Sequence, residues 1–312
     1  MKKCILFLSA FLVINSCQQQ PQQQETQQPS LREEIRQAKE LLSQAETEAR
    51  ADILDLKKYE EASNLLTIAL EKNNRAADAY ALRGWARFKM NKNDEALLDF
   101  NQSLGIDPTT VVALNGRAAI NESMKKYEEA LTDYTKASQI LGLDPTPLNN
   151  RGILKRKMGK SQEAIEDFTK AIDLNGLEPL FYFNRANAQI DLKKYDAAKA
   201  DYEKAISLNA QYAPAYAGRG NVYYQIGQFK KAIEDYNTVV NLQPNNSDAW
   251  RNRGYNKFKL GQNEAALQDL SQALTLQSTD KLAYQFRSEV YLKMNKPTEA
   301  QSDLSKVGQI LQ

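Results

Sequence analysis

The sequence contains no histidine, and its only two cysteines, Cys4 and Cys17, fall within the first 17 residues. The lack of histidine removes the most common general base and the most common metal ligand. With no cysteine beyond residue 17, the rest of the chain forms neither a disulfide framework nor a cysteine-based zinc site. A glycine-rich phosphate-binding loop is missing as well. We therefore expect neither an enzyme nor a bound cofactor.

An excess of charge of either sign is also missing. The chain has 41 lysines and arginines against 39 aspartates and glutamates. Proteins that bind nucleic acid through its phosphates are typically basic or carry a basic patch. The balance of charge gives no support for nucleic-acid binding.

One long apolar run, residues 4–14, follows Lys2 and Lys3. Its 11 residues are too few to span a bilayer, so the run is typical of a signal peptide, residues 1–16. It ends in Ile-Asn-Ser-Cys at residues 14–17, which resembles the lipobox of bacterial lipoproteins. The resemblance implies that Cys17 carries a diacylglyceryl group and a further acyl chain such as palmitate. The alternative is an ordinary secretory signal with a cysteine there by chance.

The residues after Cys17 are poor in apolar side chains. Eight of the 13 residues from 18 to 30 are glutamine, so we expect residues 17–30 to form a disordered tether. Gln18 follows the cysteine, where many enterobacterial lipoproteins retained at the inner membrane have aspartate. By the same resemblance, we expect an outer-membrane anchor with the protein facing the periplasm.

Residues 213–246 contain two helical patterns that meet at Gly227. Tyrosines and small residues recur every three or four residues in the first pattern, and Phe229, Ala232 and Tyr236 do so in the second. This spacing gives each helix one apolar face. Pro244 ends the second helix.

The same pattern recurs every 34 residues from residue 43 to the end, without insertion or deletion. The eight repeats are residues 43–76, 77–110, 111–144, 145–178, 179–212, 213–246, 247–280 and 281–312. Position 20 is alanine in every repeat: Ala62, Ala96, Ala130, Ala164, Ala198, Ala232, Ala266 and Ala300. Position 8 is Gly, Ala or Ser in every repeat except the first, which has Arg50.

This period and pattern resemble the tetratricopeptide repeat. The resemblance implies an all-α fold, a right-handed superhelical solenoid of about eight helix-turn-helix repeats within residues 31–312. We expect one helix from about Leu31 to Leu54. Its first half would cap the end of the stack, and its second half would belong to the first repeat.

A charge pair recurs within the repeats. Position 7 is arginine and position 23 is aspartate in repeats two to eight, whereas the first repeat has Ala49 and Leu65. Pairing within a repeat leaves no orphan at either end of the array, and pairing between repeats leaves two. We therefore favour ion pairs within repeats, with a stripe of arginines for anion binding as the alternative.

The resemblance also places positions 2, 5, 6, 9, 12 and 13 on a concave face that binds peptides. These positions carry amides and aromatic rings, and an amide can both donate to and accept from a peptide backbone. The peptide-binding residues we predict are Asn149, Asn150, Asn184, Asn187, Asn221, Arg251, Asn252 and Tyr255. Gly116 and Gly218 interrupt the row of asparagines and would leave room for ligand side chains. The alternative is that the asparagines are merely solvated and the aromatic residues belong to the core.

Two functions follow. The first is a lipid-anchored scaffold of the cell envelope that binds extended segments of envelope proteins or peptides. The second is a structural protein that self-associates, as a homodimer for example, through Ile310 and Leu311 in its last repeat. Measuring the size of the protein at several concentrations separates the two hypotheses.

Overall fold

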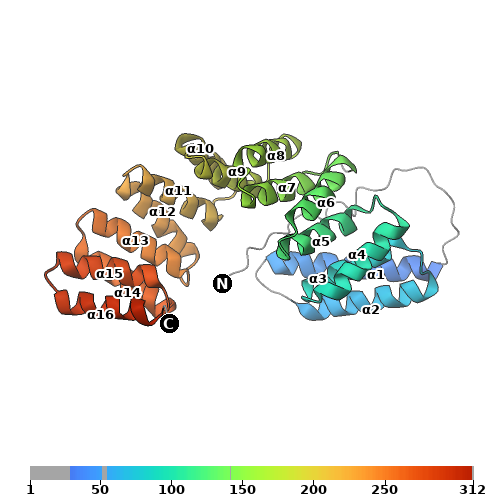
Figure 1. Cartoon of the computed structure of the whole chain (residues 1–312), viewed down its shortest axis with the longest axis horizontal. Coiled ribbons are helices and arrows are strands. Elements are labelled where there is room, and N and C mark those ends of the chain that lie inside the picture. The colour runs from blue at the N-terminus through green and yellow to red at the C-terminus, as the bar shows by residue number, and fades with distance from the viewer. Residues whose placement is uncertain (1–28, 51–54, 141, 311–312) are drawn as a thin grey trace. The chain divides into compact units, whose positions relative to one another are not determined.

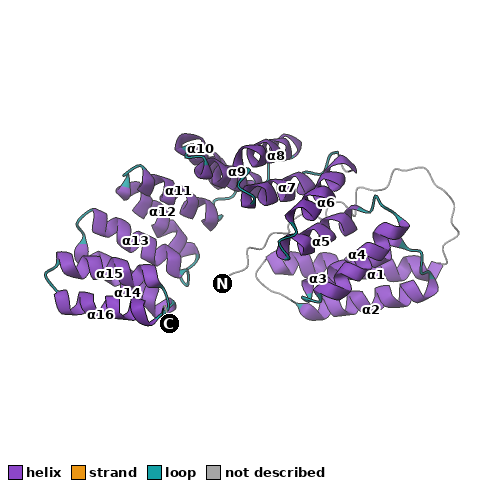
Figure 2. Cartoon of the chain, viewed as in Figure 1, coloured by secondary structure: helices purple, strands orange, loops and turns teal. Residues whose placement is uncertain are grey.

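The computed structural model describes residues 29–50, 55–140 and 142–310. Within these ranges the chain forms sixteen α-helices and no strand (Figures 1 and 2). The all-α prediction is confirmed. Cys17, the predicted signal peptide and most of the predicted tether lie outside the described residues. The last two tether residues do not, because the first helix already begins at Pro29.

The helices divide into two compact units, residues 1–175 and residues 176–312. Unit 1 contains α1 (Pro29–Arg50), α2 (Leu56–Lys72), α3 (Ala77–Lys89), α4 (Asn93–Ile106), α5 (Val111–Ser123), α6 (Tyr127–Ile140), α7 (Thr146–Lys157) and α8 (Ser161–Leu174). Unit 2 contains α9 (Pro179–Asp191), α10 (Tyr195–Leu208), α11 (Ala213–Gln225), α12 (Phe229–Leu242), α13 (Ser247–Lys259), α14 (Asn263–Leu276), α15 (Lys281–Lys293) and α16 (Pro297–Gln309). From α3 onward, the odd-numbered helices are the first helices of the predicted repeats and the even-numbered helices are the second.

The turn inside each repeat has one fixed backbone feature. Position 15 adopts a left-handed conformation in repeats two to eight, with φ between 57° and 78°. The residues are Asn91, Lys125, Gly159, Lys193, Gly227, Gly261 and Asn295. Glycine and asparagine adopt this conformation at low cost. The seven turns therefore share one geometry, and each reverses the chain between two paired helices.

Small residues bring the two helices of each repeat together. The alanines at position 20 are 0–1% exposed in all eight repeats. At position 8, a Cβ atom on Gly84 would lie 2.8 Å from the ring of Phe100 on the second helix of the same repeat. Phe100 is itself 0% exposed. Tight packing of small residues against large rings thus explains why the pattern tolerates so little variation.

The recurring charge pair lies within each repeat, as we favoured. In repeats two to eight, Nε and Nη2 of the arginine contact the two carboxylate oxygens of the aspartate at 2.6–3.0 Å. The remaining Nη1 atom often reaches position 25 of the preceding repeat. Arg117, for example, donates to Asn101 at 2.9 Å, and Arg253 donates to Asn237 at 2.9 Å. The arginine therefore also ties neighbouring repeats together.

The first repeat replaces this pair with a buried carboxylate. Glu46 on α1 is 9% exposed and accepts hydrogen bonds from the Tyr59 hydroxyl at 3.0 Å and from Trp85 Nε1 at 3.1 Å. Lys89 on α3 forms an ion pair with it at 2.9 Å. Burial, with the negative charge of Glu46, raises the pKa of Tyr59 far above its usual value. These contacts fix α1 against α2 and α3, so Trp85 belongs to the core rather than to a binding face.

Candidate functional site

The first helices of unit 2 lie side by side in a row. α9 contacts α11 and α13 contacts α15, and the rings of Tyr224 and Tyr255 join α11 to α13 with their centroids 5.9 Å apart. The surface of this row is called the first-helix face below. It carries five of the eight predicted peptide-binding residues at half-exposed or exposed positions: Asn187, Asn221, Arg251, Asn252 and Tyr255.

Two of these asparagines are held in one orientation by tyrosines. The Tyr202 hydroxyl donates to Asn187 Oδ1 at 2.7 Å, and the Tyr236 hydroxyl donates to Asn221 Oδ1 at 2.6 Å. Among the described residues the amide N–H groups of Asn187 and Asn221 have no partner. The sequence suggested amides that both donate and accept. Each tyrosine hydroxyl uses one of the two acceptor sites on the amide oxygen, so the oxygen can still accept one hydrogen bond and the N–H groups can donate.

Three predicted residues are not on an exposed face. Asn149 and Asn150 are each 4% exposed, and Asn184 is 9% exposed. The three side chains therefore do not form an exposed row of amides, and their role in peptide binding stays a prediction. Position 6 of a repeat lies against the ring at position 24 of the repeat before it. Asn252 shows this contact, with its amide nitrogen 3.5 Å from the hydroxyl of Tyr236.

The glycines at position 6 have the same neighbour. A Cβ atom on Gly116 would lie 2.2 Å from Cζ of Phe100, and one on Gly218 would lie 2.5 Å from the ring of Tyr202. The expectation that Gly116 and Gly218 leave room for ligand side chains is also wrong. The rings of the preceding repeats fill that room.

Arg251 is also engaged inside the protein. Its Nη1 atom lies 2.7 Å from Asp280 and 2.7 Å from Asp248, and its side chain is 14% exposed. Asp280 is 5% exposed and accepts from the Ala283 backbone N–H, where it caps α15. Arg251 therefore links α13 to the start of α15, which limits what it can offer a ligand.

Aromatic rings gather on α11, α13 and α15. Tyr255 stacks on Phe286 with centroids 3.8 Å apart and an interplanar angle of 16°. Phe258 lies 6.1 Å from Tyr255, and the Lys259 ammonium lies 4.7 Å from the centre of the Tyr255 ring. These rings are half-buried, so part of each faces solvent. Phe286 was not among the residues predicted from the sequence, although it occupies position 6, where most repeats have a glycine or an asparagine.

Burial and proximity set the charges of this cluster. Burial raises the pKa of Tyr224 above its usual value, so its phenol is neutral at neutral pH. A hydrogen bond with Tyr255 raises the pKa of Lys259, so its ammonium stays charged. The cluster therefore presents neutral rings beside a permanent cation.

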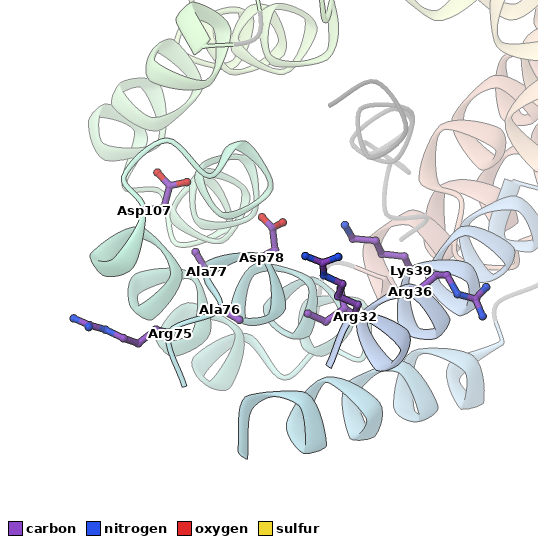
Figure 3. A pocket seen from close by; sticks show the side chains of 9 residues that line it. Arg32, Arg36, Lys39, Arg75, Ala76, Ala77, Asp78 and Asp107 are labelled. Carbon is purple, nitrogen blue, oxygen red and sulfur yellow. The ribbon is translucent and has the colours of Figure 1, made fainter. Parts of the chain in front are cut away.

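Unit 1 contains a separate hollow of about 500 Å³ between α1 and the start of α3 (Figure 3). Arg32 on α1 and Asp78 on α3 project toward the same space, with Lys39 and Asp107 at its edge. Arg36 pairs with Glu33 and Glu40 instead. Charges of both signs therefore line the hollow.

Metal-binding and membrane-spanning features were sought in the part of the chain that the structure describes. No group of three or more acidic or metal-ligating side chains there could hold a metal ion. None of the helices in that part combines the length and apolar character that crossing a bilayer requires.

Comparison with sequence families identifies the repeats. Models of the tetratricopeptide repeat match residues 54–110, 146–176, 179–212 and 247–280, and a model described as TPR repeat matches residues 220–257. Two of these matches, 179–212 and 247–280, coincide with predicted repeats. No curated protein matches the chain.

Solved structures show the same fold at low sequence identity. A tetratricopeptide repeat protein from Parabacteroides merdae is 20% identical with a TM-score of 0.59, covering 84% of this chain and 98% of that one. PilF from Pseudomonas aeruginosa is 22% identical with a TM-score of 0.58, covering 69% and 92%. A chain of the Cut9–Hcn1 hetero-tetramer of the APC/C is 20% identical with a TM-score of 0.61, and the match covers 81% of this chain. This chain spans about half the length of that chain. These similarities establish the helical solenoid fold.

Proposed function

Because this chain is built from tetratricopeptide repeats, we propose that it is a protein-binding scaffold whose first-helix face in unit 2 holds extended segments of partner proteins. Stacked repeats expose long continuous surfaces, and such surfaces suit extended chains. The observation that carries the proposal is the orientation of Asn187 and Asn221. Adjacent repeats hold both amides with their N–H groups unpaired, where they can donate to carbonyls of a bound main chain.

The aromatic cluster supplies the apolar part of the same surface. Half-buried rings with a polar surround are typical of the residues that contribute most to protein–protein binding. Tyr255, Phe258 and Phe286 are packed against one another and are therefore preorganised. A partner would lose little free energy in ordering them. The proposal is for binding rather than catalysis, in keeping with the missing histidine.

Conservative substitutions test the two amide donors. In the double variant Asn187→Asp and Asn221→Asp, the oxygens that accept from Tyr202 and Tyr236 remain, but the amide N–H groups are lost. We expect affinity for a partner recovered from the native envelope by crosslinking to fall by about 0.5–1.5 kcal/mol for each lost hydrogen bond. A binding isotherm measures the change, and circular dichroism checks that helical content is retained.

The matched control is Asn241→Asp. Asn241 is exposed on α12, a second helix of unit 2, and its substitution adds one negative charge, as each of the two tested substitutions does. We expect its affinity to equal that of the unaltered protein. If the double variant binds as tightly as this control, the first-helix donors do not contact the partner.

We further propose that Cys17 anchors the protein to the outer membrane, facing the periplasm. The support is the Ile-Asn-Ser-Cys sequence at residues 14–17 and the glutamine-rich segment after it. Each buried methylene of an acyl chain contributes about 0.8 kcal/mol, and more than one chain is needed for stable anchoring. Its envelope location would bring the scaffold to partners in the same compartment.

Cys17→Ser is expected to remove the anchor. The variant should stay unprocessed or move to the soluble fraction, because serine lacks the thiol to which the diacylglyceryl group is attached. Fractionation with and without detergent, followed by mass spectrometry of the N-terminal peptide, measures the result. Recovery of Cys17→Ser in the detergent-dependent fraction at the unaltered level, with the normal N-terminus, would refute lipidation at this residue.

A further inference from the structure

The C-terminal part of the first-helix face carries an apolar strip with a cationic edge. The strip consists of Tyr224, Tyr255, Phe258, Phe286 and Leu292, and the edge consists of Lys259 and Lys293; together these are called the aromatic–lysine patch. Tyr224, Phe258 and Leu292 occupy position 12 of three consecutive repeats, and the lysines occupy position 13 of the last two. The repeat thus places both rows along one surface.

The rings of the patch form one connected cluster. Tyr255 lies at its centre, 5.9 Å from Tyr224, 6.1 Å from Phe258 and 3.8 Å from Phe286. Leu292, at the position equivalent to Tyr224 and Phe258, is 55% exposed. An apolar surface of this kind is stabilised when a partner covers it.

The two lysines are available to a partner. Both are exposed, and among the described residues neither forms an ion pair. Lys257, two positions before Lys259, behaves differently, because it forms an ion pair with Asp269 at 2.7 Å. Lys259 also lies over the rings, 4.7 Å from the centre of Tyr255 and 5.8 Å from that of Phe258. Its ammonium is therefore held at the edge of the apolar strip.

One acidic residue lies nearby. Glu289 is exposed on α15 at position 9 and acts electrostatically on Lys259 and Tyr224. Two lysines against one glutamate leave the patch with a net positive charge. Arg251 carries one positive charge against the two negative charges of Asp248 and Asp280, and this group lies near the start of α13, whereas Lys259 is the last residue of that helix.

We propose that the aromatic–lysine patch recognises an acidic, extended segment of a partner protein in which an aromatic or large aliphatic residue lies two residues from a carboxylate. In an extended chain, side chains two residues apart point to the same side and are separated by roughly 6.5–7 Å. A large apolar side chain of such a segment can contact the ring cluster while its carboxylate meets the Lys259 ammonium, which lies 4.7 Å and 5.8 Å from the centres of the Tyr255 and Phe258 rings. The inference rests on the proposed function, because it names the segment that the same face selects.

Charge reversal in both molecules tests the selectivity. The probe is a fluorescent, end-capped peptide with three copies of phenylalanine–serine–aspartate–glycine, compared with versions in which asparagine or lysine replaces aspartate. We expect the aspartate peptide to bind most tightly to the full-length protein and the lysine peptide least. In the double variant Lys259→Glu and Lys293→Glu, the aspartate peptide should bind about 10-fold more weakly and the lysine peptide should become the preferred one. Fluorescence anisotropy measures each affinity.

The matched control reverses the same number of charges elsewhere in unit 2. Lys204 on α10 and Lys230 on α12 are exposed on second helices, so Lys204→Glu with Lys230→Glu should leave the order of the three peptides unchanged. Equal binding of the aspartate and asparagine peptides to the unaltered protein overturns the inference, and so does the same peptide order in both double variants. If either of these results is obtained while the native partner still crosslinks to the first-helix face, the proposed function stands without this selectivity. If neither the peptides nor the native partner bind that face, both proposals fail.

Discussion

Gly116→Ala is expected to destabilise unit 1 by about 3 kcal/mol, at the upper end of the range for overpacking. The added Cβ atom would lie 2.2 Å from Cζ and 2.5 Å from Cε2 of the Phe100 ring. That ring cannot move away, because it is 0% exposed and its other side lies against Gly84. The lowered urea midpoint of unfolding, followed by circular dichroism, measures the effect.

Gly105→Ala is the matched control for this substitution. Gly105 lies in α4, is exposed, and has no atom within 4 Å of the position where its Cβ would be. Alanine favours a helix over glycine by up to about 1 kcal/mol, so this variant should be slightly more stable. Adding Phe100→Leu to Gly116→Ala should restore part of the lost stability, since leucine occupies the same position in three repeats: Leu66, Leu270 and Leu304. Equal stability of Gly116→Ala and Gly105→Ala would contradict the packing described at position 6.

Arg219→Met is expected to lower the free energy of unfolding by about 3–5 kcal/mol, the range for removing one partner of a buried ion pair. Arg219 contacts both carboxylate oxygens of Asp235, at 2.7 Å and 3.0 Å, and Asp235 is only 4% exposed. Asp235 has no second cation in the described structure. Arg253→Met is the comparison: it should cost less, because Lys257 still contacts Asp269 at 2.7 Å.

The loss of stability caused by Arg219→Met should depend on pH. Burial raises the pKa of the Asp235 carboxyl above its usual value even in the presence of the arginine, and removing Arg219 raises it further. The folded variant then binds a proton more tightly than the unfolded chain. The ionised Asp235 carboxylate therefore destabilises the folded variant when the pH is above this raised pKa. Protonation removes the destabilisation as the pH falls through the pKa. The difference between the urea midpoints of the variant and the unaltered protein should therefore shrink between neutral and acidic pH. A difference that stays constant or grows would argue against a buried, unpaired carboxylate.

The features that recur within the helix pair of each repeat were predictable from the sequence. The alanine at position 20 and the Arg–Asp pair involve two helices joined by one short turn, so a 34-residue period specifies them directly. The first repeat could not be predicted in this way. Glu46 has no counterpart elsewhere in the array, and its contacts with Trp85 and Lys89 join α1 to a helix of the next repeat.

The candidate site was harder to predict, because its residues depend on the neighbouring repeat. Asn150 and Asn184 carry the residue type expected of a binding surface, yet both are buried. They are buried because a large ring occupies position 24 of the preceding repeat. The chain itself shows this rule: an aromatic ring at position 24 precedes a glycine or an asparagine at position 6, whereas Leu66 and Leu270 precede the larger Leu82 and Phe286.

The most direct test of the account is site-specific photo-crosslinking at Asn221 in the native envelope, with Asn241 as the reference position. Both residues are exposed in the same repeat, Asn221 on the first helix and Asn241 on the second. A photoreactive residue at each position would report which face contacts a partner. The account predicts covalent adducts with a partner protein from position 221 and none from position 241. Adducts from position 241 alone, or from both positions in equal amount, would contradict the claim that the first-helix face is the binding surface.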